Sequence, residues 1–240
     1  MPTVEGAGVE LAYEDEGRDP PTTLVVHGMA SGAAASAALR SRLQGRVIAH
    51  DRRGYGGSGA PEPYAATTVQ EQGEDAAALL SALGAAPVRV VGFGFGALIA
   101  LDLLVRRPEL VASAVLCDAP LLAFVPEANE ALSAQRQQLE DALRDGGPPA
   151  AIAHWLGPDA TPEELSRGQA SPRGFFADYA GLATWSPSRR ELRGIGVPVV
   201  FVTGPDSGPH VIEAADEAAG LVPGASRRTD GDVLAALGGH

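Results

Sequence analysis

The sequence predicts an α/β fold in which a mostly parallel central sheet is flanked by helices. Three observations support this prediction: short apolar runs recur along the chain, helical stretches lie between them, and several runs end abruptly at glycine or charged residues. Alternating strands and helices favour parallel pairing with helices on both faces. Ligands of such sheets bind at the carboxyl ends of the strands, so we expect the site in the loops there.

Six segments are predicted as strands. In the first, Val9, Leu11 and Tyr13 alternate with polar or small residues, as in a half-buried strand near a sheet edge. The others are continuous apolar runs, which are typical of strands buried on both faces. They comprise residues 22–26, 46–50, 88–91, 112–116 and 197–202.

Helices are predicted between these strands. Residues 68–83 begin with a threonine cap, and residues 97–105 are almost wholly apolar, as in a helix buried beneath a sheet. Residues 119–192 interrupt the alternation and hold half of the aromatic residues. Within them residues 130–144 are predicted to be helical, with the Gly-Gly-Pro-Pro run at 146–149 as a stop. We therefore predict a core of residues 1–118 and 193–240, with a helical cap inserted at 119–192.

Composition restricts the class of protein. A chain of 240 residues suits one domain, and its net charge of −12 opposes binding to nucleic acid or to anionic membranes. No stretch approaches the ~20 apolar residues of a membrane span, and the first residues lack the pattern of a secretion signal. We expect a cytoplasmic protein. The oligomeric state is not predicted.

Two residue types limit the chemistry. Cys117 is the only cysteine, which leaves no disulfide framework and is typical of a small buried side chain. All 18 basic residues are arginine. The absence of lysine excludes a Schiff-base lysine. It is also typical of a GC-rich genome, for example an actinobacterial one.

Three motifs occur in a characteristic order. His27-Gly28 follows a strand, the loop Asp51-Arg52-Arg53-Gly54-Tyr55-Gly56-Gly57-Ser58 follows another, and Gly92-Phe93-Gly94-Phe95-Gly96 joins a strand to the apolar helix. They resemble the oxyanion loop, the D-x-R-G-x-G-x-S loop and the G-x-S-x-G nucleophile elbow of the α/β-hydrolase superfamily. The resemblance covers nearly the whole chain and implies the α/β-hydrolase fold. A dinucleotide-binding loop is a poorer match, because the G-x-G-x-x-G spacing is absent.

The catalytic triad that this resemblance implies is missing at each position. Gly94 stands where the nucleophilic serine belongs and has no side chain to attack with. Ser207 stands where the orienting acid belongs, with Asp206 one residue early. Asp118 is a secondary acid candidate, although it also suits a turn cap. Val233 stands where the basic histidine belongs. Hydrolysis by the usual triad is therefore not expected.

The histidines offer no replacement base and no metal site. His27 belongs to the oxyanion motif, and His50, His154 and His210 lie in unrelated segments. His240, the last residue, has the character of a tail or tag remnant. No H-x-x-x-H or paired-cysteine pattern is present, and no nicotinamide or flavin fingerprint. We predict no metal and no cofactor.

The remaining chemistry is carbonyl binding. The backbone N–H groups of Met29 and Phe95 are expected to form an oxyanion site. Apolar surface is predicted to surround it, although plain core packing is an alternative for each side chain. The predicted oxyanion and substrate-binding residues are His27, Gly28, Met29, Phe95, Val233, Phe124, Trp155, Phe175, Phe176 and Trp185.

An oxyanion site without a base suits proton abstraction next to a carbonyl, with a carboxylate of the substrate as the base. The chain resembles triad-less members of the superfamily that act in bottromycin-type peptide biosynthesis. That resemblance implies epimerisation of an aspartate beside a thiazoline in a modified ribosomal peptide. A cyclase or lyase of natural-product assembly and a non-catalytic ligand-binding protein are alternatives. A further one is a hydrolase whose water is activated by Asp118 or His154. The expected partner is a small-molecule or modified-peptide substrate.

Overall fold

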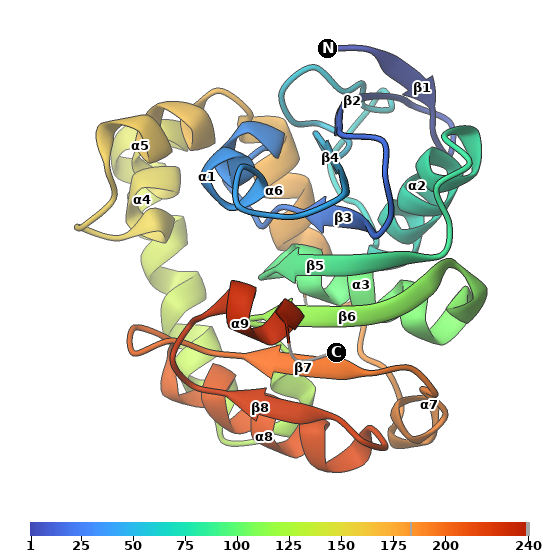
Figure 1. Cartoon of the computed structure of the whole chain (residues 1–240). Helices are drawn as coiled ribbons and strands as arrows, with labels where there is room; N and C mark the ends of the chain where they lie inside the picture. Colours follow the sequence, from blue (N-terminus) through green and yellow to red (C-terminus); the bar gives the residue numbers. More distant parts are fainter. Residues whose placement is uncertain (183, 239–240) are drawn as a thin grey trace.

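The chain forms one eight-stranded sheet (Figure 1). The computed structural model describes residues 1–182 and 184–238. Strands β1 and β2 pair antiparallel, β2 also pairs antiparallel with β4, and all other neighbours are parallel. The predicted α/β fold with a mostly parallel sheet is thus confirmed. The order across the sheet is β1 (Thr3–Glu5), β2 (Glu10–Glu16), β4 (Arg46–His50), β3 (Thr22–Val26), β5 (Val88–Phe93), β6 (Val111–Cys117), β7 (Val199–Val202) and β8 (Ser226–Arg228).

Alternate side chains of the central strands enter separate cores on the two faces. In β5, Val90 belongs to the larger cluster, whereas Val91 belongs to the smaller cluster beneath α9. Both are fully buried, as the continuous apolar run predicts for a strand covered on both faces.

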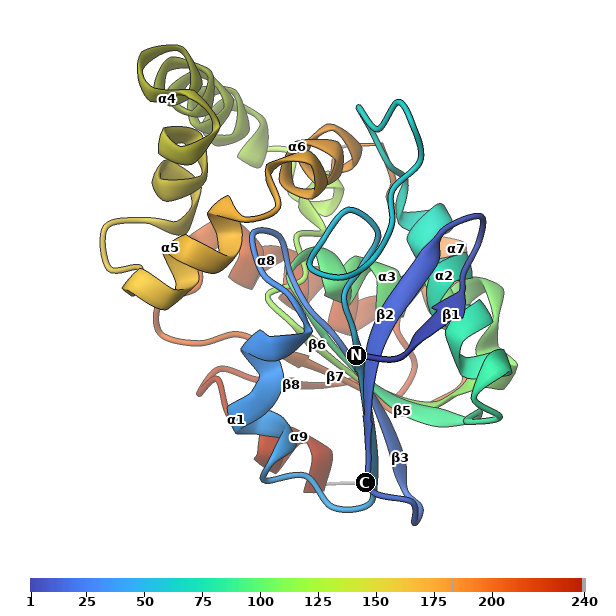
Figure 2. The same cartoon turned by 90° about the horizontal axis from the view of Figure 1, so that it is seen from above.

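Helices cover both faces (Figure 2). The larger core lies under α2 (Val69–Ala82), α3 (Phe95–Arg106), α7 (Arg189–Arg193) and α8 (Pro209–Leu221). The opposite face carries α1 (Ala37–Arg40) and α9 (Val233–Gly238). Three short 3₁₀ turns complete the core and its connections: Ala33–Ser36, Pro108–Leu110 and Leu122–Phe124. As predicted, Thr68 caps α2, and it forms a reciprocal capping box with Glu71.

The sequence missed some boundaries for identifiable reasons. Strand β5 continues through Gly92 and Phe93, because the strand pairs with β6 up to Cys117. Strands β1 and β8 were not predicted, since each has three residues and no buried apolar run. Helix α9 was not predicted either.

Three further helices come from residues 119–192. They are α4 (Ala128–Leu156), α5 (Pro162–Gln169) and α6 (Pro172–Gly181). Gly147 has φ 69° and ψ −168°, so α4 consists of two helices that meet at the predicted break. Helices α4 and α5 lie beyond the carboxyl ends of β5 and β6 (Figure 1). No helix among residues 1–182 and 184–238 is long and apolar enough to cross a membrane.

Candidate functional site

The turn between β5 and α3 keeps the sharp geometry of an elbow. Gly94 has φ 52° and ψ −116°, and its N–H donates to Cys117 O at 2.9 Å. A Cβ added to Gly94 would meet no atom within 4 Å. The turn therefore directs this position into open space, and only the side chain is absent.

Two other glycines bring the elbow close to the neighbouring loop. A Cβ on Gly96 would be 2.3 Å from Val26 O and 2.6 Å from His27 O. A Cβ on Gly92 would be 2.4 Å from Gly96 O. Since a real Cβ does not fit at either position, Gly92 is required for the close approach of α3 to β5 and Gly96 for its close approach to β3. This approach places the first turn of α3 beside the loop after β3.

A cavity of about 1050 Å³ opens at the carboxyl ends of these strands. Its wall includes Gly94 and six of the predicted oxyanion and substrate-binding residues. These six are His27, Gly28, Met29, Phe95, Trp155 and Val233. Residues far apart in the chain are thus brought together around the elbow.

The backbone N–H groups of Met29 and Phe95 are free at this wall. Phe95 is the first residue of α3, so its N–H has no partner within the helix. In the described part of the chain, neither nitrogen donates a hydrogen bond to another residue. The helix dipole adds partial positive charge at the Phe95 N–H. The two donors are available for a carbonyl oxygen that gains negative charge.

His27 is a structural residue at this wall. Its Nδ1 lies 2.8 Å from Gly28 O, and its Nε2 accepts the N–H of Arg52 at 3.1 Å. Burial, followed by the charge of Arg52, holds the pKa of His27 well below its ordinary value. The imidazole is therefore neutral, and both nitrogens are occupied. It has no free position from which to act as a base.

Serine occupies the position expected for the acid and contacts a carboxylate. The Ser207 hydroxyl accepts from Gly204 N at 2.8 Å and donates to Asp118 Oδ1. Asp118 directly follows β6 and has φ 48°, an uncommon conformation for a residue with a side chain. Asp118, Asp206 and Ser207 all line the cavity. Two aspartate carboxylates thus line the cavity, but position 207, where the acid is expected, carries a hydroxyl group.

Valine occupies the position expected for the base. Val233 is the first residue of α9, and the preceding Asp232 accepts from Ala235 N at 2.9 Å. The side chain of Val233 lines the cavity and packs against the smaller core. A hydrocarbon side chain at this point removes the proton acceptor of a triad.

No described histidine other than His27 lines the cavity. His50 is buried at the end of β4, and His154 lines a separate hollow beside α5. His210 lies in the first turn of α8. His240 lies outside the described residues. Among residues 1–182 and 184–238, no group of three or more His, Cys, Asp or Glu is placed to hold a metal ion.

Four predicted aromatic residues do not reach the cavity wall, and that prediction was wrong. Phe175 is fully buried behind Trp155, with ring centroids 5.7 Å apart, and Phe176 packs against Phe175 at 5.1 Å. Phe124 packs beneath the guanidinium of Arg189, and Trp185 packs against the larger core. Phe175 and Phe176 lie in α6, Phe124 lies in the 3₁₀ turn Leu122–Phe124, and Trp185 lies between α6 and α7. All four rings pack within the protein and do not line the cavity.

The loop after β4 holds the oxyanion loop through Arg52, a role that the sequence analysis missed. Arg52 Nη2 donates to Gly28 O at 2.9 Å and to Asp178 Oδ2 at 2.6 Å. Gln72 Nε2 and Tyr55 Oη donate to the same carboxylate, each at 2.7 Å. Arg52 and Asp178 are 1% and 0% exposed, so this is a buried ion pair. It joins α6 to the core beside the site.

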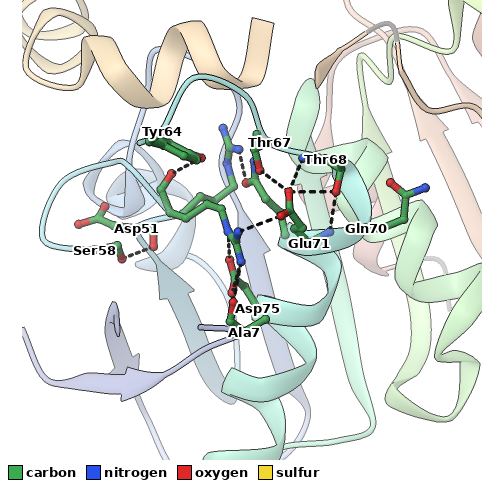
Figure 3. Close-up of polar contacts among 12 residues, drawn as sticks. Ala7, Asp51, Ser58, Tyr64, Thr67, Thr68, Gln70, Glu71 and Asp75 are labelled. Carbon is green, nitrogen blue, oxygen red and sulfur yellow. Dashed lines mark hydrogen bonds and ion pairs between the residues drawn. The ribbon is translucent and has the colours of Figure 1, made fainter. Parts of the chain in front are cut away.

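The rest of the loop is used for structure (Figure 3). Asp51 accepts from Gly57 N at 2.9 Å, and Ser58 Oγ donates to Asp51 O. Asp75 in α2 receives two hydrogen bonds from Arg53, at 2.6 and 2.9 Å. These contacts leave no catalytic group of the loop facing the cavity.

The family follows from sequence as well as from this geometry. The sequence pattern of the alpha/beta hydrolase fold family matches residues 21–156, more than half of the chain. The chain belongs to the α/β-hydrolase family. This α/β-hydrolase is similar over 96% of its length to a thermophilic esterase from Thermogutta terrifontis, with 24% identity, a TM-score of 0.73 and 90% of that chain covered. At this identity the likeness shows the fold alone.

Curated relatives of this α/β-hydrolase match over shorter segments. It is 38% identical over 113 residues to "Putative non-heme bromoperoxidase BpoC" of Mycobacterium tuberculosis, covering 45% of this chain and 41% of that protein. It is 30% identical over 145 residues to "Uncharacterized hydrolase YraK" of Bacillus subtilis, covering 60% of this chain and 52% of that protein. The chain thus spans about half the length of the curated relatives it matches.

Proposed function

We propose that this member of the α/β-hydrolase family is an enzyme that does not hydrolyse its substrate. It polarises a carbonyl group and inverts the configuration of the carbon beside it. The observation that carries the proposal is the elbow. Its geometry and both N–H donors are present, whereas Gly94 has no nucleophile and Val233 no proton acceptor. A site with this content can bind and polarise a carbonyl but cannot form an acyl-enzyme in the usual way.

The proposed reaction moves one proton out and one proton in. The carbonyl oxygen accepts from the N–H groups of Met29 and Phe95. A carboxylate of the substrate takes the proton from the carbon next to the carbonyl, and the electron pair of that C–H bond forms an enolate. Water delivers a proton to the opposite face of the enolate, and the substrate carboxyl releases its proton to water, which gives the epimer with no oxidant or cofactor consumed. Two preorganised donors stabilise such an enolate by a few kcal/mol.

The surroundings of the donors support a substrate-borne base. His27 is neutral and hydrogen-bonded through both nitrogens. Met29, Phe95 and Val233 place apolar side chains at the wall. A low local dielectric strengthens the electrostatic interaction between the two N–H donors and the enolate oxygen, and it thereby favours the proton transfer that forms the enolate.

The narrowest form of the proposal names the substrate. By its resemblance to the bottromycin-type branch, the enzyme epimerises an aspartate beside a thiazoline in a modified ribosomal peptide of natural-product biosynthesis. The vacated triad positions and the arginine-only composition support this form. We propose residues 119–192 as the cap over a core of residues 1–118 and 193–240. Leu132, Gln135 and Trp155 from this range line the cavity, which supports that division.

Deuterium exchange tests the reaction. The protein is incubated in deuterated water with a peptide that carries an aspartate beside a thiazoline. Mass spectrometry is expected to show one deuterium at the inverted carbon, together with a second chromatographic peak. A peptide returned unchanged contradicts catalysis and favours the ligand-binding alternative. A cyclised or cleaved product favours the cyclase or lyase.

Two controls separate the other candidates. Asp118→Asn is expected to keep the exchange rate within about twofold, because the base belongs to the substrate; loss of exchange would assign the base to Asp118. Asp118 and His154 were the two residues considered for activating a water molecule. Asp118 lines this cavity, whereas His154 lines a separate hollow, so the hydrolase alternative depends on Asp118. A short nitrophenyl ester tests that hydrolase, and robust turnover of the ester would overturn the proposal.

A further inference from the structure

One arginine lines the cavity on the side of β3. Arg167 belongs to α5, and its Cδ lies 3.9 Å from the position that a Cβ on Gly32 would take. The helix can approach this loop because its next residue is Gly168. A Cβ there would be 3.1 Å from Ala30 Cβ and 3.0 Å from Ile152 Cγ2. Arg167 is thereby held beside the oxyanion loop.

The guanidinium of Arg167 is not engaged in a direct polar contact with the described residues. In residues 1–182 and 184–238, its guanidinium makes no ion pair and no hydrogen bond. Glu164 lies one turn earlier in α5 and also lines the cavity, but its carboxylate is engaged at the start of the helix. Its Oε2 accepts from Thr161 N at 2.8 Å and from Thr161 Oγ1 at 2.7 Å. Arg167 is half-buried, and its guanidinium carries five N–H donors.

The opposite wall has the opposite charge. Asp118 follows β6 and Asp206 follows β7, and both line the cavity. The sheet order places β6 and β7 two and three strand spacings from β3. This corresponds to about 10–14 Å, since neighbouring strands lie about 4.8 Å apart. On the β3 side Arg167 lies in α5 with the exposed Glu164. An anionic group in the cavity is therefore repelled from the β6–β7 side, and Arg167 is the one arginine of the described lining that it can contact.

We propose that Arg167 is the anion-recognition residue of the cavity and holds a ligand carboxylate on the β3 side. The planar guanidinium can bind a carboxylate through two parallel hydrogen bonds. This inference rests on the proposed function in two respects: the cavity is the substrate site, and the base belongs to the substrate. A carboxylate paired with a guanidinium is a weaker base. The group that takes the proton must then be a second one, and the substrate class is an acidic ligand with at least two carboxylates.

A matched pair of fluorescent ligands tests the proposal without turnover. Dansyl-glycine carries a carboxylate, and dansyl-glycinamide has nearly the same shape without the charge. Titration of each into the full chain, followed by dansyl emission excited through tryptophan, gives both dissociation constants. The acid is expected to bind about fivefold more tightly than the amide, as for a partly exposed ion pair. Raising the salt concentration should reduce this preference.

Three variants assign the preference to Arg167. Arg167→Gln is expected to bind both ligands with the affinity of the amide, and Arg167→Lys to keep part of the preference. Arg42→Gln changes the net charge by the same amount at an exposed residue outside the cavity wall, and it should keep the full preference. Thermal melting checks that each variant is folded.

Three results would overturn the proposal: equal affinities in the natural protein, no measurable binding of the acid, or a preference that persists in Arg167→Gln. These results are distinguishable from failure of the proposed function. Carboxylate preference without deuterium exchange keeps the anion site and removes the epimerase. Exchange without carboxylate preference keeps the epimerase and removes the role of Arg167.

Discussion

Substitution of Gly94 by alanine tests whether the elbow retains a backbone conformation that glycine alone adopts without strain. With φ 52° and ψ −116°, the position costs a residue with a side chain about 1–3 kcal/mol. Steric overlap adds nothing, because an added Cβ meets no atom within 4 Å. Gly94→Ala is therefore expected to lower the free energy of unfolding by about 1–3 kcal/mol, entirely through the backbone.

Two other glycines calibrate this value. At Gly96 an added Cβ would lie 2.3 Å from the backbone oxygen of Val26, which cannot move without distorting β3. Gly96→Ala is expected to cost more than about 3 kcal/mol. Gly196 lies exposed before β7, without a positive φ and with no atom within 4 Å of an added Cβ. Gly196→Ala is expected to stay within about 0.5 kcal/mol of the natural protein.

Urea unfolding at pH 7, followed by tryptophan fluorescence, measures all three variants. A common slope against urea concentration shows that the same surface is exposed in each case. The loss in the free energy of unfolding is expected to be smallest for Gly196→Ala, intermediate for Gly94→Ala and largest for Gly96→Ala. If Gly94→Ala is as stable as Gly196→Ala, the elbow is not strained. If it loses as much as Gly96→Ala, the space beyond Gly94 is filled.

Three further predictions concern the surroundings of the site. Asp178→Asn leaves the buried charge of Arg52 without its carboxylate and is expected to cost about 3–5 kcal/mol in urea unfolding; natural stability would contradict the buried pair. Burial lowers the pKa of His50 from 6.5 to about 3, so the unfolded state binds more protons below pH 6.5 and stability falls with falling pH. By pH 5 this loss is about 2 kcal/mol, and His50→Gln should show that much less loss between pH 7 and pH 5; an unchanged slope would contradict it. Gly94→Ser is expected to leave hydrolysis of short esters at background, because Val233 accepts no proton, whereas adding Val233→His should raise it; turnover by the single variant would reveal another base.

The family relationship and the site content point in different directions. The curated relatives named above include a protein named as a hydrolase. The nucleophile and base positions of such enzymes correspond here to Gly94 and Val233 on our assignment. Gly94 keeps the conformation of an elbow but has no side chain that could attack a substrate. A common fold does not imply a common reaction.

Local patterns were sufficient for much of the fold. The apolar run at 88–91 predicted a strand because a strand buried on both faces admits no polar residue, and Thr68 predicted a helix start because its hydroxyl accepts an N–H of the first turn. Strands β1 and β8 were not predicted, since short strands with exposed side chains carry no such pattern. Their positions depend on pairing with distant segments.

The sequence by itself determined which chemical groups the elbow lacks. The absence of a side chain at Gly94 is visible from spacing alone, because the motif is continuous along the chain. The tertiary structure decided what faces the cavity. Trp155 reaches the wall while Phe175 lies behind it, and Arg167 is left unpaired beside the oxyanion loop. These positions depend on how α4, α5 and α6 dock on the core, which is set by packing between residues remote in sequence.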